Sequence, residues 1–240
     1  MQSRDRVIVA VDLSEREEIL RLVDELRGAV GLFKLGLQAF VANGPSIVRE
    51  VVGRGEKVFL DLKLHDIPNT AKHAVLEASR LGASMLTVHA AGGEAMLRAC
   101  AAAAPDLLIL GVTVLTSLDD AELANIGFHG APMENAVRLA ALAKRAGLRG
   151  VVASPLEIQA IRAECGEDFI IVTPGIRPEG SDAGDQKRTL TPAEAVAAGA
   201  SYIVVGRPIT GAKDRRAAAE EIVVGCRLSV VGRQAPTDNR

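Results

Sequence analysis

The stretch KVFLDLKLHDIPNT, residues 57 to 70, begins as an apolar strand and then gains charged side chains ahead of a proline. Successive side chains of a β-strand point to opposite faces, so Asp61 and Lys63 share one face while Leu62 and Leu64 share the other. An unpaired charge is costly to bury, so the charged face is either a solvated edge or a functional site. The rest of the sequence decides between these two interpretations.

The same strand-like pattern recurs along the whole chain, in short apolar runs separated by amphipathic helical segments. Eight runs show it: VIVAV (7–11), GLFKLG (31–36), KVFLDLK (57–63), MLTVHA (85–90), LLILGVTVL (107–115), GVVAS (150–154), FIIVTPG (169–175) and YIVVGR (202–207). Continuous apolar strands that alternate with helices are typical of a parallel sheet covered by helices, and eight such units predict a closed (β/α)8 TIM barrel. An open doubly wound sheet is the alternative, and it is less favoured because no G-x-G-x-x-G follows the first strand.

A single α/β domain is expected, because no linker interrupts the alternation. Residues 1–225 are predicted to form the barrel, and residues 226–240, which lose periodicity and turn polar, are predicted to form a frayed tail. Helix boundaries are also visible in places. Ser14, three residues before Glu17, predicts a capping box at the start of the first helix, and Gly28 predicts its end.

Composition excludes some classes of function. The chain is 48% hydrophobic with a net charge of −2, whereas nucleic-acid binding draws on a surplus of Lys and Arg. Aromatic residues make up only 2%, with no Trp, so most stacking platforms for bases are missing. We therefore expect neither a nucleic-acid partner nor a membrane, since no apolar segment reaches the length of a span.

The cysteines and the first residues indicate the compartment. Cys100, Cys165 and Cys226 are odd in number and far apart, which suggests neither a disulfide framework nor a zinc site. The apolar run before Asp12 is too short for the core of a signal peptide. A reducing cytoplasm is expected.

Charged side chains gather where the predicted strands end, which is where TIM barrels carry their chemistry. Lys34 closes the second strand, Asp61 and Lys63 the third, and Asp66 follows in the turn. One Asp–Lys pair alone would fit a structural ion-pair network. Four alternating charges from two neighbouring strands and one turn favour a site, which Asp12 on the first strand could join as a polar ligand contact.

A second stretch, VVGRPITGAKD at 204–214, follows the eighth strand, where barrels of this class often hold a phosphate. Gly206 lets the backbone approach a ligand, Arg207 supplies a fork of donors, and Pro208 is typical of the first turn of a helix. A glycine turn with a surface arginine is the alternative interpretation of this stretch.

The loop VTPGIRPEGSDAGDQKR, residues 172–188, is long for a compact domain. Such loops are often lids or binding loops, and disorder is the alternative. Arg177 and Gln186 could reach a ligand phosphate from it. A metal site is not indicated, because the four histidines lack the spacing of metal ligands.

These stretches together resemble the bacterial orotidine 5′-phosphate decarboxylase family. The motifs VAVD, FKLG, DLKLHDIPNT, VHAAGG, VTVLTS, VTPGIRP, DQKR and VVGRPIT follow one another in that family's order from Val7 to Asp214. Val11 is a conservative departure from the usual leucine. The resemblance implies decarboxylation of orotidine 5′-monophosphate to UMP and CO2 in pyrimidine biosynthesis, without cofactor or metal.

The resemblance also implies roles for individual residues. Lys63 is expected to donate a proton to C6 of the pyrimidine, with Lys34, Asp61 and Asp66 completing an alternating array of charges. A homodimer is implied, in which Asp66, Ile67 and Thr70 enter the partner's site. The implied substrate contacts are Asp12 and Lys34 to ribose, Thr116 and Ser154 to the pyrimidine, and Arg177, Gln186, Gly206 and Arg207 to phosphate.

Two other functions remain possible from the sequence. Mg²⁺-dependent sugar-phosphate decarboxylases such as the 3-keto-L-gulonate 6-phosphate enzymes share a D-x-K-x-x-D pattern, but they have a Glu where this chain has Lys34. A phosphometabolite-binding protein without catalysis is the other possibility. It would need the phosphate contacts but not four mutually perturbing charges.

Overall fold

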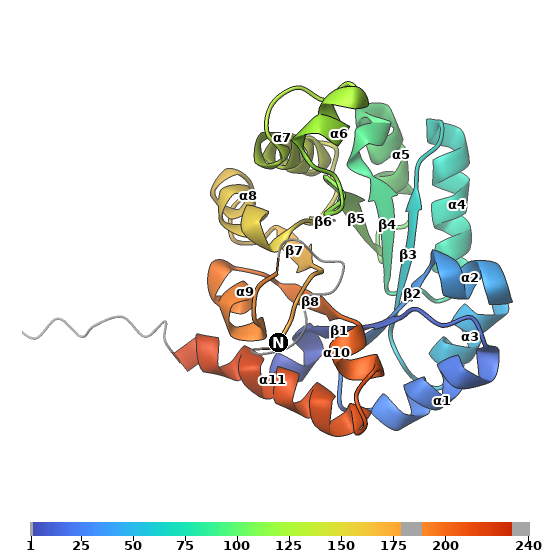
Figure 1. Cartoon of the computed structure of the whole chain (residues 1–240). Coiled ribbons are helices and arrows are strands. Elements are labelled where there is room, and N and C mark those ends of the chain that lie inside the picture. Colours follow the sequence, from blue (N-terminus) through green and yellow to red (C-terminus); the bar gives the residue numbers. More distant parts are fainter. Residues whose placement is uncertain (1, 179–188, 232–240) are drawn as a thin grey trace, which may run out of the picture.

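Eight parallel strands close into a barrel, as predicted, in a computed structural model that describes residues 2–178 and 189–231 (Figure 1). The strands follow chain order around the barrel, and β1 closes the ring by pairing with β8. Their bounds are β1 Val7–Val11, β2 Leu32–Gly36, β3 Val58–Leu64, β4 Met85–His89, β5 Leu108–Val112, β6 Gly150–Val152, β7 Ile170–Thr173 and β8 Tyr202–Val205.

Helices form the outer ring around these strands (Figure 1). The α-helices are α1 Arg16–Leu26, α2 Leu37–Asn43, α3 Ser46–Gly53, α4 Pro68–Arg80, α5 Glu94–Ala103, α6 Asp120–Asn125, α7 Pro132–Arg145, α8 Ile158–Cys165, α9 Pro192–Ala198, α10 Arg207–Thr210 and α11 Arg215–Val231. Short 3-10 helices are η1 Ser3–Arg6, η2 Ala90–Gly92 and η3 Pro155–Glu157.

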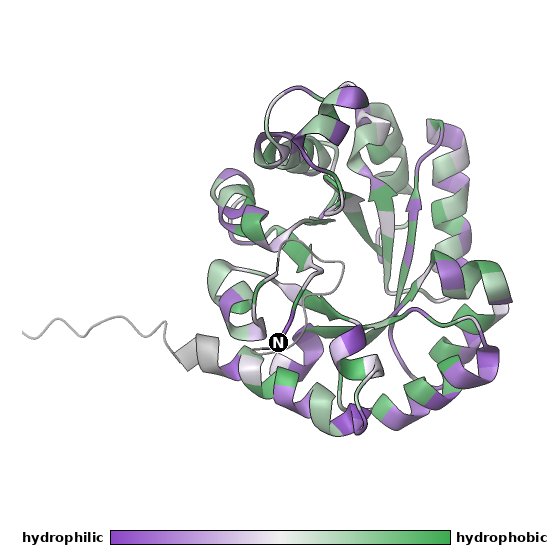
Figure 2. Cartoon of the chain, viewed as in Figure 1, coloured by the Kyte–Doolittle hydropathy of each residue, from purple (hydrophilic) through white to green (hydrophobic). Residues whose placement is uncertain are grey.

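Buried apolar side chains form three clusters, and the two largest fill the main regions of the fold. The larger cluster lies between the strands and the helices, and Figure 2 shows the strands mostly in the green of apolar residues with hydrophilic positions gathered on the helices. The smaller cluster fills the barrel interior with Ile8, Ala10, Leu32, Phe59, Met85, Leu108, Leu110, Val172 and Val204. Because strand side chains alternate, Asp12, Lys34 and Asp61 continue these interior rows at the C-terminal end of the barrel.

The predicted capping box at the start of α1 is wrong. Glu15, not Ser14, is the N-cap residue, and no side chain caps the helix. The Ser14 hydroxyl instead accepts a hydrogen bond from Gln38 Nε2 at 3.0 Å. The Ser14 hydroxyl therefore bonds to a side chain on α2 and does not cap the start of α1.

The C-terminal helix extends further than the sequence indicates. Helix α11 continues past residue 225 to Val231, so the predicted tail begins inside a helix. Residues 232–240 lie outside the described residues, and the frayed tail therefore stays a prediction for them.

Candidate active site

A cavity of about 480 Å³ opens at the C-terminal end of the barrel. Its walls come from seven of the eight strands, counting their ends and the segments that follow them, which is the arrangement expected for catalysis on this fold. The lining residues are Ala10, Asp12, Lys34, Phe59, Asp61, Lys63, Val112, Val114, Leu115, Thr116, Val152, Ala153, Pro174, Gly175, Arg177, Val204, Gly206 and Arg207.

Strand β3 bulges where it reaches this cavity. Leu60 pairs with Leu86 and Leu64 with Val88, so β3 contains more residues than β4 between these two pairs. Lys63 lies inside the bulge with φ of 50°, and it is the one non-glycine residue with positive φ in the described ranges. A left-handed conformation at such a residue costs about 1–3 kcal/mol and persists only where the surroundings enforce it.

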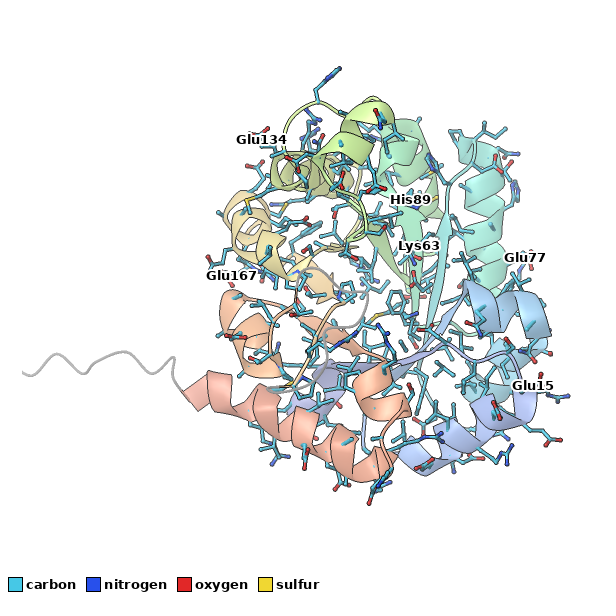
Figure 3. The ribbon with its side chains drawn as sticks, viewed as in Figure 1. Glu15, Lys63, Glu77, His89, Glu134 and Glu167 are labelled. Carbon is cyan, nitrogen blue, oxygen red and sulfur yellow. The ribbon has the colours of Figure 1, made fainter. Side chains whose placement is uncertain are left out.

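Four side chains at the cavity form a row of alternating charge. Asp61 Oδ2 lies 2.9 Å from Lys63 Nζ and 3.6 Å from Lys34 Nζ. Lys34 Nζ lies 3.3 Å from Asp12 Oδ1. The prediction that Asp61 and Lys63 point the same way is confirmed by their contact, while Leu62 packs against the outer core. Figure 3 shows the labelled Lys63 and His89 inside the ring of helices, with the labelled glutamates at the periphery.

Charge at Asp61 is stabilised by its partners. Burial raises the pKa of this carboxyl, but the Lys34 and Lys63 ammonium groups, with hydrogen bonds from Lys63 and Thr87, outweigh it and hold the pKa below the ordinary 3.8. Asp61 is therefore ionised at neutral pH. Its carboxylate contacts the side-chain nitrogens of both lysines.

Residues after β7 and β8 also line the cavity. Gly206 is the N-cap of α10, and Arg207 is the first residue of that helix. Arg177 reaches the same cavity from the segment after β7, where its N–H donates to Leu190 O at 3.0 Å beside an Ile176–Leu190 bridge. Two arginines thus line the same cavity as the charged row, an arrangement suited to an anionic substrate.

Comparison with known proteins identifies the family. A family model described as "Orotidine 5'-phosphate decarboxylase / HUMPS family" matches residues 5–222. The chain belongs to this family. It is accordingly a decarboxylase, that is, a carboxy-lyase.

Relatives of this decarboxylase match it over most of its length. The orotidine 5′-phosphate decarboxylase of Moorella thermoacetica is 53% identical over 92% of both chains. That of Paramagnetospirillum magneticum is 51% identical over 90% of this chain and 96% of the relative. The crystal structure of orotidine 5′-phosphate decarboxylase from Lactobacillus acidophilus gives a TM-score of 0.82 at 37% identity, covering 92% of this chain and 98% of that one.

The other predicted residues of the decarboxylase lie in different surroundings. Thr116 lines the cavity. Ser154 does not: it is fully buried behind Ala153, and its Oγ has no hydrogen-bond partner within the described ranges. Gln186 lies outside the described residues, as does the rest of its loop from 179 to 188.

Three predicted residues lie away from the cavity of their own chain. Asp66, Ile67 and Thr70 are exposed at the end of β3 and the start of α4. The Asp66 carboxylate accepts the N–H of Ile67 at 2.7 Å. The structure thus brings Asp12, Lys34, Asp61 and Lys63 together but leaves Asp66 facing outward.

Sequence reasoning missed Thr87, which contacts two members of the site. Its Oγ accepts the N–H of Lys63 and donates to Asp61 Oδ1, both at 2.9 Å. Alternation within MLTVHA places Thr87 on the same face as His89 and could have indicated it. A lone threonine in an apolar run is common in strands, so the signal is weak.

His89 extends the polar surroundings of Lys63. Its ring lies 5.3 Å from that of His65, measured between centroids. Burial lowers the pKa of His89, the positive charges of His65 and Lys63 lower it further, and Asp61 opposes them. His89 is therefore neutral at physiological pH and adds no second cation beside Lys63.

Two findings concern other kinds of site. Within the described ranges, no group of three or more His, Cys, Asp or Glu side chains is placed to hold a metal ion. In the same part of the chain, none of the helices has the length and apolar character that crossing a membrane requires.

Proposed function

We propose that this decarboxylase converts orotidine 5′-monophosphate to UMP and CO2 in pyrimidine biosynthesis, without a cofactor, with Lys63 as the proton donor to C6. The observation that carries the proposal is the ammonium of Lys63, 2.9 Å from Asp61 in a cavity that two arginines also line. The names of the relatives support the choice of substrate.

Loss of CO2 from this pyrimidine leaves an electron pair on a vinylic carbon that has no ordinary resonance sink. The protein must therefore stabilise that charge electrostatically and supply a proton. Lys63 can do both, since its ammonium carries the positive charge and the hydrogen. Asp61 accepts a hydrogen bond from this ammonium at 2.9 Å and so holds it at the cavity.

Asp61 contributes in a second way, through its charge. A substrate carboxylate at about 4 Å from Asp61 would be repelled by about 4 kcal/mol at an effective dielectric near 20. The repulsion disappears as neutral CO2 departs, and full relief in the transition state corresponds to roughly a thousandfold in rate. Asp61 therefore accounts for part of the acceleration and not for all of it.

Binding of the phosphate supplies further energy, far from the reacting carbon. We assign the phosphate to Arg177, Gly206 and Arg207, together with Gln186. The two arginines offer forked donors, and Gly206, the N-cap of α10, lines the same cavity. Binding energy from such a remote group can organise the reacting end of the site.

The ribose and the pyrimidine of the substrate are assigned to other residues at the cavity. Asp12 and Lys34, joined at 3.3 Å on adjacent strands, are assigned to the ribose hydroxyls. Thr116, on the cavity wall, is assigned to the pyrimidine. Ser154 is assigned there too, although its hydroxyl lies behind the wall and would have to act through its surroundings or after a local shift.

A homodimer completes the site in this proposal, with Asp66, Ile67 and Thr70 entering the cavity of the partner. The exposure of the apolar Ile67 side chain, at 67%, next to the charged Asp66 supports this assignment. Helix α2, which follows the neighbouring strand, exposes Leu37 at 54% and Val41 at 79%. Apolar side chains exposed together on one side of a barrel are typical of an interface.

A cytoplasmic location fits the chemistry of the cysteines. Cys100 and Cys226 are buried, and burial raises the pKa of each thiol to about 11. Such thiols are protonated at neutral pH and react slowly with oxidants. They suit a reducing compartment and have no part in the proposed reaction.

The direct test adds orotidine 5′-monophosphate to the purified protein in excess EDTA and measures UMP and CO2. We expect turnover that chelation does not change, because the Lys34 ammonium holds the place between two carboxylates that a cation would take. Turnover that EDTA abolishes and Mg²⁺ restores would favour the sugar-phosphate decarboxylase type. Binding without loss of substrate absorbance would favour a phosphometabolite-binding protein.

A further inference from the structure

Thr87 lies on β4 directly across from the bulge of β3, and its side chain is 0% exposed. One hydroxyl makes two directed hydrogen bonds there. It accepts the backbone N–H of Lys63 and donates its own proton to Asp61 Oδ1, each over 2.9 Å. Because a hydroxyl has a single proton, accepting from Lys63 leaves that proton for Asp61.

The bulge explains why a side chain is needed at this point. Residues 61–63 have no partner in the β3–β4 register, which resumes only at Leu64 with Val88. The N–H of Lys63 therefore depends on the Thr87 hydroxyl for a buried acceptor. Without that acceptor, the left-handed backbone of Lys63 would lose the contact that holds it.

The second bond fixes the direction of the Asp61 carboxylate. With Oδ1 held by Thr87, Oδ2 is the oxygen that faces Lys63 Nζ at 2.9 Å and Lys34 Nζ at 3.6 Å. Rotation of the Asp61 carboxylate would break its hydrogen bond from Thr87 and its contacts with the two lysines. Thr87 thus restrains the backbone that carries Lys63 and the carboxylate that binds the Lys63 ammonium.

We propose that Thr87 is a positioning residue for decarboxylation, setting through one hydroxyl the conformation of Lys63 and the orientation of Asp61. The inference rests on the proposed function of the site, since it concerns groups that act on the substrate. Thr87 is not among the residues lining the cavity, so a role in substrate binding is not part of it. Its effect belongs to the chemical step.

The hydroxyl also influences protonation. Donation from Thr87 is one of the contacts that keep the pKa of Asp61 low, after burial, which raises it, and the two lysines. Removing this donor raises the pKa of Asp61. Asp61 would then take up a proton at a higher pH, and the acidic limb of the pH–rate profile would move upward with it.

The experiment compares Thr87→Val, which keeps the shape and removes the hydroxyl, with Thr87→Ser, which keeps the hydroxyl. Thr113→Val is the matched control, because the Thr113 hydroxyl is also buried at a strand end but donates only to Val152 O at 3.1 Å. We expect kcat to fall about 10- to 100-fold in Thr87→Val. KM and the Kd for UMP should change by less than about threefold.

Two further readouts separate positioning from a structural role. In Thr87→Val the acidic limb of the profile of kcat against pH should shift to higher pH. In Thr87→Ser both kcat and the position of this acidic limb should be close to those of the wild-type protein. Thr113→Val should alter only the melting temperature. Unchanged kcat and an unchanged pH profile in folded Thr87→Val would overturn the proposal. Thr87→Ala takes its place if the valine variant does not fold.

Failure of the proposed function can be told apart from failure of this inference. Absence of UMP formation by the wild-type protein would overturn the decarboxylation of orotidine 5′-monophosphate, whatever Thr87 does. The titration of Lys63, followed by NMR with ¹³C-labelled lysine, needs no turnover. A changed Lys63 titration in Thr87→Val and not in Thr113→Val supports positioning, and identical titrations overturn it.

Discussion

Lys63 is constrained at both its ends. Its ammonium is held by Asp61 at 2.9 Å, and its backbone N–H is held by Thr87 at the same distance in a left-handed conformation. A flexible lysine normally loses considerable side-chain freedom when it is ordered for a reaction. Here the folded chain has already ordered it, so substrate binding does not have to.

At this scale we predict that Lys63→Ala removes turnover. The loss should be at least about 1000-fold in kcat, because the general acid and the nearest positive charge disappear together. The Kd for UMP should change less than about tenfold, since the phosphate contacts remain. Enzyme assay and titration calorimetry measure the two effects.

The matched control for this prediction is Lys57→Ala. Lys57 is an exposed lysine immediately before β3, at the opposite end of the same strand. Its removal should leave kcat unchanged. A Lys63→Ala enzyme with a rate near that of wild type would exclude Lys63 as the donor.

Asp61 makes stability depend on pH. Its pKa in the folded chain is lower than its ordinary value, so its contacts stabilise the fold above the ordinary carboxyl range, and this contribution is lost as pH falls through the folded pKa. Asp61→Asn cannot titrate. Its free energy of unfolding should be lower at neutral pH by roughly 1–3 kcal/mol but should fall less steeply below about pH 5. Urea denaturation at several pH values tests this, and equal slopes would contradict it.

At the scale of elements, arginine side chains close the ends of helices. Arg162 on α8 donates from Nη1 to the carbonyls of Gly166, Glu167 and Phe169 at 2.8, 2.8 and 2.6 Å, and from Nη2 to Gly199 O at 2.7 Å. These carbonyls follow the last turns of α8 and α9, where helices leave acceptors unmet. One side chain thus ties two neighbouring helix ends to β7.

We predict that Arg162→Ala destabilises the fold without altering the site. The free energy of unfolding should fall by about 2–4 kcal/mol, because four carbonyls, two of them in partly buried hydrogen bonds, lose a charged donor. Arg98→Ala is the control, since Arg98 pairs only with Glu94 on the same exposed helix face and should cost no more than about 0.5 kcal/mol. Chemical denaturation compares them, and equal losses would contradict the prediction.

Elements also show where local sequence signals fail. Ser14 and Glu17 have the spacing of a capping box, yet Gln38 on α2 binds the Ser14 hydroxyl. The run 107–115 predicts a long strand, but β5 ends at Val112, and Leu115 and Thr116 line the cavity instead. In both cases contacts between distant segments outweigh the local structural preference of a few consecutive residues.

For the whole molecule, an active site shared between two subunits predicts that two different inactive variants can restore activity when their subunits mix. If Asp66 acts in the partner's cavity, mixing inactive Lys63→Ala and Asp66→Asn homodimers creates hybrid dimers with one intact site. Random exchange between subunits of a two-fold dimer should restore about a quarter of wild-type activity. Activity is measured before and after subunit exchange, with exchange followed by a labelled subunit.

The control for this experiment mixes Lys63→Ala with Lys34→Ala. Both lysines line the cavity of the same chain, so no hybrid dimer of these two variants contains an intact site. This mixture should remain inactive. No recovery in the first mixture, with exchange confirmed, would show that the site is not shared.

The linear pattern of residues is enough to predict the barrel and most of its charged row. Apolar strands alternating with helices can bury their surfaces only as a covered parallel sheet, and the alternation of Asp61 and Lys63 fixes their common face. Strand-end position then directs Asp12, Lys34 and Arg207 to the same cavity. The alternation of side chains within a strand and the alternation of strands with helices are both regular along the chain. Both can therefore be recognised in the sequence alone.

Which side chains meet depends on packing between distant segments. Thr87 and Lys63 come from different strands, and their contact depends on a bulge that no local pattern of residues 57–70 announces. The burial of Ser154 behind Ala153 and the outward direction of Asp66 likewise depend on packing between units. The physical reason is that register and bulges are set by the sum of many contacts between distant segments, whereas a linear pattern reports only the preferences of near neighbours.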